Sequence, residues 1–183
     1  MKTINILGIA GSLRKGSYNK QLLSIAKSIL PEDMTMKIHD ISNIPLYNAD
    51  VEMENIPVAV QDLKNEIARA DGVLIATPEY NRSIPGVMKN VIDWASTPAK
   101  TSPLPGKPVA IIGAGGRLGT AYAQAHLRQV VVANNMLVMN KPEVMIRYAA
   151  KQFDEIGNLL DKKYVELLSR LLSGFRDWII NIQ

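Results

Sequence analysis

The chain has 183 residues, of which 47% are hydrophobic and 21% charged, and its formal net charge at pH 7 is +4. This length suits one domain, residues 1–183, with a single buried core. The absence of cysteine excludes disulfides, thiolate metal centres and cysteine nucleophiles, and two histidines argue against a histidine-rich metal site. Any redox chemistry therefore depends on a bound cofactor.

The predicted elements alternate between strands and helices along the whole chain. In chain order, the apolar runs that predict strands are 3–10, 34–40, 72–77, 108–113 and 136–140. The segments with helical spacing are 18–30, 57–70, a helix that follows Pro85 and includes 87–94, 118–133 and 160–181. We therefore expect an α/β fold, a flavodoxin-like doubly wound sheet of five parallel strands with helices on both faces. In such a sheet the ligand lies at the carboxyl ends of the strands, so the loops after the first, third and fourth strands are the candidate site.

The loop after the first strand, GSLRKGSYN at 11–19, has the composition of a phosphate-binding turn. Glycines let backbone N–H groups point inward, Ser12 and Ser17 add hydroxyl donors, and Arg14 adds a planar cation at the start of a helix. A nucleoside triphosphatase is a poor match, because Ser17 stands where the pattern G-x-x-x-x-G-K-[ST] requires lysine. The alternative is a plain glycine-rich turn in which Ser17 caps the helix.

The loop after the third strand, TPEYNRSIPG at 77–86, contains two prolines that enforce an irregular backbone. Its peptide groups are therefore left available to a ligand at the edge of the sheet. Tyr80 offers a flat wall and Asn81 a mixed donor and acceptor, which suits a heterocycle with carbonyl and N–H groups. The alternative is a simple turn whose Tyr80 covers the edge of the core.

These motifs together resemble those of the NADPH-dependent FMN reductases, whose relatives include bacterial quinone, chromate and azo-dye reductases. The resemblance lies in GSLR with Ser17 and Asn19, in PEYN at 78–81, in SIPGVMKN at 83–90 with IDW at 92–94, and in IPLY at 44–47 and MNKPE at 139–143. It implies non-covalently bound FMN, with the phosphate held by Ser12, Arg14, Ser17, Tyr18 and Asn19. It also implies that Pro78, Glu79, Tyr80 and Asn81 line the isoalloxazine ring. We expect Glu79 to act through its backbone, with its carboxylate exposed or paired rather than transferring protons.

The loop after the fourth strand, GAGGRLG at 113–119, is one residue away from the dinucleotide fingerprint G-x-G-x-x-G. Leu118 stands at the third glycine, and the following strand carries no acidic residue to bind a ribose, which disfavours a flavin-free dehydrogenase. By the family resemblance this loop packs beside the flavin edge, so Gly113, Ala114, Gly115 and Gly116 join the predicted cofactor site. The role of Arg117 stays open, with a solvated surface position as the default.

The leading hypothesis is an FMN-dependent oxidoreductase that takes hydride from NADPH or NADH and passes electrons to a quinone, azo compound, chromate or free flavin. The alternative is a flavodoxin-type electron carrier without its own substrate, which the positive net charge disfavours. No cysteine or histidine falls in the three loops, so we expect no catalytic side chain and no metal ligand there.

We expect a cytoplasmic protein without nucleic-acid or membrane partners. The apolar run 4–10 is too short for a signal peptide or a membrane span, and the basic residues are dispersed among few aromatic ones. The small-molecule acceptor is one partner, and the resemblance implies a homodimer or homotetramer with the third and fourth helices near the contact. Trp94 belongs either to that contact or to the core, and His126 is expected to make a structural hydrogen bond.

Overall fold

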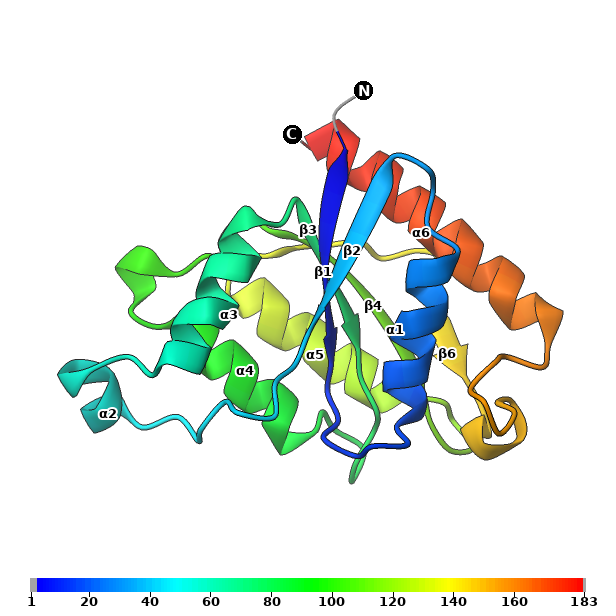
Figure 1. Ribbon diagram of the computed structural model, residues 1–183, viewed down its shortest axis with the longest axis horizontal. Coiled ribbons are helices and arrows are strands. Elements are labelled where there is room, and N and C mark those ends of the chain that lie inside the picture. The colour runs from blue at the N-terminus through cyan, green and yellow to red at the C-terminus, as the bar shows by residue number, and fades with distance from the viewer. Residues whose placement is uncertain (1–2, 183) are drawn as a thin grey trace.

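The structure is a computed structural model that describes residues 3–182, and it contains one parallel sheet flanked by helices (Figure 1). The strands run in the order β2-β1-β3-β4-β5, and β6 also pairs with β4. Their bounds are β1 Ile4–Ala10, β2 Met34–His39, β3 Gly72–Ala76, β4 Pro108–Ala114, β5 Leu137–Val138 and β6 Val144–Ile146. The predicted doubly wound parallel sheet is thereby confirmed, with six strands in place of five.

The helices follow the predicted segments closely, with one addition. They are α1 Tyr18–Ser28, α2 Ala49–Glu54, α3 Val58–Arg69, α4 Gly86–Ser96, α5 Ala121–Ala133 and α6 Lys162–Ile182, with single turns η1 at Ala99–Thr101 and η2 at Ala149–Lys151. The additional helix is α2, which is capped by the Asn48 side chain and has no buried residue. A helix this short and exposed leaves no apolar periodicity in the sequence.

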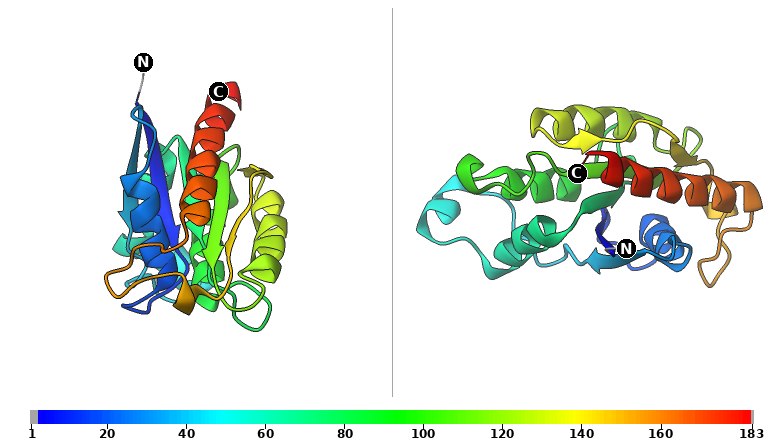
Figure 2. Two further views of the ribbon diagram at one scale, coloured as in Figure 1. Left: turned by 90° about the vertical axis from the view of Figure 1, so that its right-hand side faces the viewer. Right: turned by 90° about the horizontal axis from the view of Figure 1, so that it is seen from above.

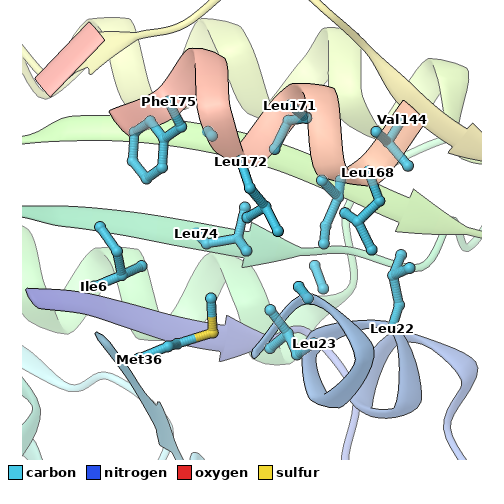
Figure 3. Close-up of a cluster of buried hydrophobic side chains, with 14 of the residues drawn as sticks. Ile6, Leu22, Leu23, Met36, Leu74, Val144, Leu168, Leu171, Leu172 and Phe175 are labelled. Carbon is cyan, nitrogen blue, oxygen red and sulfur yellow. The ribbon is translucent and has the colours of Figure 1, made fainter. Parts of the chain in front are cut away.

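The central strands are apolar, apart from the exposed Asn5 near the start of β1, because both faces of the sheet are covered. On one face, α1 and α6 pack over Ile6, Leu74 and Ile112, whereas α3, α4 and α5 pack over residues such as Leu7 and Ile75 on the other. The view from above in Figure 2 shows these two helix layers on opposite sides of the sheet. Figure 3 shows the first cluster, in which the apolar stripe of α6 meets α1 and the strands through Leu168, Leu171, Leu172 and Phe175.

The fifth strand predicted at 136–140 is present but shorter, and a sixth strand follows it. Only Leu137 and Val138 pair with the start of β4, and the chain returns as β6 against the end of β4. Pro142 has no N–H to contribute to a ladder, and the Met139 carbonyl accepts a hydrogen bond from Arg128 Nη1 of α5 at 3.1 Å. The Met139 N–H still donates to the Val109 carbonyl of β4 at 2.9 Å, but the Met139 carbonyl is satisfied away from the sheet, and the strand is interrupted there.

Two aromatic residues whose roles were open have structural positions. Trp94 is 1% exposed and donates its indole N–H to the Pro45 carbonyl at 2.8 Å, so the core interpretation is confirmed and its side chain is not available to a subunit contact. His126 is exposed, and its Nδ1 lies 2.6 Å from Ser83 Oγ, which is the structural hydrogen bond that we expected. No helix within residues 3–182 is long and apolar enough to cross a membrane.

Gly113 lies inside β4, and its missing side chain makes room for the protein rather than for a ligand. A Cβ built there falls 2.1 Å from Thr120 Oγ1 and 2.6 Å from the Thr77 carbonyl oxygen. Thr77 and Thr120 are themselves fully buried, so neither has space to move.

We predict that Gly113→Ala lowers the free energy of unfolding by about 2 kcal/mol or more, because a buried overlap forces the backbone apart. Gly116→Ala is the matched control, since a Cβ at Gly116 meets nothing within 4 Å. Urea denaturation of both variants measures the difference. Equal stabilities would contradict the packing role of Gly113.

Candidate functional site

A pocket lies at the carboxyl edge of the sheet, where the loops after β1, β3 and β4 meet at the end of the molecule opposite to the start of β1 (Figure 1). Its walls are Ser12, Arg14, Ser17, Tyr18, Asn19, Pro78, Glu79, Tyr80, Ala114, Gly115 and Gly116. The structure thus brings eleven of the thirteen predicted site residues together. Asn81 and Gly113 do not line the pocket.

The first wall is the N-terminus of α1. Ser17 is 2% exposed, and its hydroxyl oxygen caps the helix by accepting a hydrogen bond from the Lys20 N–H. The N–H groups of Tyr18 and Asn19 belong to the first helical turn, where no intrahelical acceptor exists. The same turn contains no acidic residue, so the positive end of the helix dipole is not neutralised locally. This wall has the features of an anion subsite.

Arg14 adds an exposed positive charge to this wall. It is exposed and forms no ion pair with any carboxylate of residues 3–182, and its guanidinium lies 5.2 Å from the centre of the Tyr18 ring. The Tyr18 ring also stacks on Phe153, with 5.2 Å between the ring centroids. Phe153 is a single aromatic residue in an irregular segment, so no sequence pattern points to it.

Asn19 lines the pocket, and its side chain makes two hydrogen bonds within the protein. Its side-chain Nδ2 donates to the Ala114 carbonyl at 2.9 Å, and its Oδ1 accepts from the Ala114 N–H at 3.0 Å. The side chain is 2% exposed. The side chain therefore joins α1 to the end of β4. The backbone N–H of Asn19 is the group of this residue that remains available to an anion.

The second wall is the start of the loop after β3. Tyr80 and Ser83 exchange both backbone hydrogen bonds, and the two residues between them have left-handed backbones, with φ of 51° at Asn81 and 59° at Arg82. Asn81 is therefore a turn residue that does not line the pocket, and its contact with the ring stays a prediction. Tyr80 is 53% exposed, so it is free to cover a ligand instead of the core edge.

Glu79 uses its carboxylate within the protein. Oε2 accepts a hydrogen bond from the Ala123 N–H in the first turn of α5 at 3.0 Å, so the expected pairing is present. The Glu79 N–H itself has no acceptor within residues 3–182. The backbone of this wall thus retains a donor, as a heterocyclic ligand with carbonyl groups requires.

The third wall is the glycine-rich loop after β4. Gly115 donates its N–H to the Ile146 carbonyl, and the carbonyls of Gly115 and Gly116 accept from Ala149 and Tyr148. These bonds hold the loop against the segment that follows β6. Arg117, beside this wall, is exposed, as its default interpretation required.

A second pocket lies at the end of β2, with Lys20, Ser24, His39 and Asp40 on its walls. Partial burial lowers the pKa of His39, which keeps its ring neutral near pH 7. The Ser42 side chain and backbone hold the pKa of the Asp40 carboxyl below its ordinary value. An anionic carboxylate and a neutral ring make this second pocket a poorer phosphate site than the N-terminus of α1.

Residues 4–151 match the protein family described as NADPH-dependent FMN reductase. The chain is 50% identical over 177 residues to an NAD(P)H-dependent FMN reductase of Pseudomonas aeruginosa, covering 96% of this chain and 95% of the relative. It is 41% identical over 177 residues to a 2-hydroxy-1,4-benzoquinone reductase of a Burkholderia species, covering 96% of each chain.

A solved structure of a flavoenzyme is also similar to this chain. The flavoenzyme NAD(P)H:(acceptor) oxidoreductase FerB of Paracoccus denitrificans superimposes with a TM-score of 0.90 at 35% identity, covering 98% of both chains. The relatives therefore extend along the same length of chain as the sheet and the three loops described above.

Proposed function

The chain belongs to the NADPH-dependent FMN reductase family and is an FMN-dependent NAD(P)H oxidoreductase, and we propose that it holds FMN in the pocket between α1 and the loops after β3 and β4. The observation that carries this proposal is the N-terminus of α1, which combines free first-turn N–H groups, the absence of an acid and the unpaired Arg14. Such a turn suits the single phosphate of FMN.

Different walls of the pocket bind different parts of the cofactor. We assign the phosphate to Ser12, Arg14, Ser17 and the N–H groups of Tyr18 and Asn19, and the ring to Pro78, Glu79, Tyr80 and the loop 114–116. Bound FMN supplies the hydride chemistry between NAD(P)H and the acceptor. The protein orients the ring with backbone donors and keeps Tyr80 beside it, and no side chain of these walls is required to move a proton.

The acceptor is a small molecule, and we propose a quinone as its first class. The half-exposed Tyr80 ring gives a flat apolar surface at the pocket, which suits a planar quinone better than the compact oxyanion chromate. The Burkholderia relative carries a quinone in its name, which supports the same choice. Azo compounds and free flavin are also planar and follow as further acceptors.

Arg14→Ala tests the phosphate assignment. We predict that it weakens FMN binding by about 1.5–3 kcal/mol, the range for hydrogen bonds to charged groups, while riboflavin affinity hardly changes because riboflavin has no phosphate. Fluorescence titration of the apoprotein with both flavins measures this. Lys15→Ala is the matched control, since Lys15 is an exposed cation in the same loop but does not line the pocket.

An equal loss for both flavins would remove Arg14 from the phosphate site. The wider proposal fails if the purified wild-type protein shows no flavin absorption band after reconstitution with excess FMN. Released flavin identified as FAD would likewise contradict a pocket built for one phosphate.

NAD(P)H and the acceptor should bind in turn. Because the walls cover the rest of the cofactor, the nicotinamide and a flat acceptor both need the place beside Tyr80, at a near-attack distance of roughly 3–3.5 Å. We therefore predict ping-pong kinetics, seen as parallel double-reciprocal plots when both substrates are varied. Intersecting plots would show that the two substrates bind together.

We also propose that the protein forms a homodimer or homotetramer. The segment around α2 exposes Leu46, Met53 and Val58 at 83%, 79% and 77%, an apolar surface beside α4 that a second copy of the chain would cover. Trp94 supports this segment from inside through its bond to Pro45. Light scattering should show at least a dimer, and Met53→Lys should shift it toward the monomer. A wild-type monomer at micromolar concentration would contradict the assembly.

A further inference from the structure

The helix α5 receives its N-terminal cap from another part of the chain. Thr120 occupies the N-cap position but makes no capping hydrogen bond, because its hydroxyl accepts from the Gln124 side chain at 3.0 Å. The first turn of α5 contains no acidic residue. The carboxylate of Glu79 fills both needs, since it accepts the Ala123 N–H at 3.0 Å and places a negative charge at the positive end of the helix.

Two further contacts join the same loop to the same helix. The Arg82 guanidinium lies 5.4 Å from the centre of the Tyr122 ring, and Ser83 Oγ lies 2.6 Å from His126 Nδ1. Tyr122 and His126 are four residues apart, so they lie on one side of α5. The loop after β3 is therefore attached to α5 along more than one helical turn.

Glu79 provides the attachment at the point where the backbone is otherwise least restrained. Thr77 is fixed to β4 by its N–H bond to the Ile112 carbonyl, and Tyr80 is fixed by its paired bonds with Ser83. Between them, Pro78 has no N–H and the Glu79 N–H has no acceptor within the described residues. Within the loop the Pro78 carbonyl accepts a hydrogen bond from Thr77 Oγ1 at 2.9 Å, and the Glu79 carboxylate links this short stretch to α5.

We propose that Glu79 is a positioning residue: by capping α5 it fixes the backbone of 78–80, the wall against which the flavin ring lies. The proposal rests on the assignment of FMN to this pocket. Its carboxylate acts as a hydrogen-bond acceptor toward the protein and takes no part in proton transfer. Flavin affinity is therefore coupled to the N-terminus of a helix that contributes no side chain to the pocket walls.

The test compares Glu79→Ala with Glu79→Gln. Alanine removes the acceptor, so we expect the affinities for FMN and riboflavin to fall by the same factor, about tenfold, because the ring end is common to both ligands. Glutamine keeps a side-chain oxygen that accepts the Ala123 N–H, so its loss should stay within about threefold. Amide hydrogen exchange at Ala123 gives a readout independent of catalysis and should be faster in Glu79→Ala than in Glu79→Gln.

A control separates positioning from general destabilisation. Asn48→Ala removes another helix cap, the bond from the Asp50 N–H to Asn48 Oδ1 at 2.9 Å, in a helix that does not line the pocket. It should lower stability while leaving the affinities for both flavins unchanged. Ser83→Ala removes the contact with His126 and gives a second measure of the attachment if Glu79→Ala fails to fold. It should also weaken FMN and riboflavin by one common factor.

Three results would overturn the proposal. The first is a Glu79→Ala protein with wild-type riboflavin affinity, or a foldable Ser83→Ala protein with wild-type affinity where Glu79→Ala does not fold. The second is an equal loss of flavin affinity in Glu79→Gln and Glu79→Ala, which would show that the hydrogen bond to the Ala123 N–H does not fix the wall. The third is a thousandfold fall in kcat of Glu79→Gln with flavin affinity retained, which would assign a proton-transfer role. Failure of the wild-type protein to bind FMN would instead reject the proposed function itself.

Discussion

The site depends on the paired hydrogen bonds between the side-chain amide of Asn19 and the backbone of Ala114. The two residues are far apart in sequence, and the amide is almost fully buried, so water cannot replace either bond. The pair sets the distance between the N-terminus of α1 and the end of β4. Two walls of the pocket are therefore in place before any ligand arrives, which lowers the entropic cost of binding.

The helices α1 and α5 begin at the same edge of the sheet, but their N-termini differ in whether a carboxylate is bound there. The N-terminus of α5 is satisfied internally by the Glu79 carboxylate, whereas that of α1 has no acidic residue and remains available. An anionic ligand gains little at an end that already holds a negative charge. This asymmetry explains why the phosphate assignment falls on α1 and the heterocycle on the loop beside α5.

The sequence predicts the elements whose burial is repetitive and fails where a single side chain chooses among partners. The strands β1, β3 and β4 lie in the interior of the sheet, so they form largely apolar runs, and their carboxyl ends place three loops together by topology alone. The sequence does not predict that the Asn19 side chain bonds to the end of β4 or that Asn81 has a left-handed backbone. An asparagine amide suits a ligand, a strand end or a turn equally well. Phe153 belongs to no periodic pattern. Pro142 lies in the motif MNKPE at 139–143, and the family resemblance of that motif conceals the break in the last strand.

The break in the last strand also affects how the protein behaves at high concentration. A long unpaired strand edge is a template for another chain, and this edge is divided into pieces of two and three residues separated by a proline-containing detour. The opposite edge, β2, carries Lys37, which forms an ion pair with Glu66 at 3.0 Å. The first edge therefore offers no uninterrupted row of backbone groups, and the second carries a charged side chain. Association of copies is thus directed away from open-ended strand addition and toward closed contacts between helical surfaces.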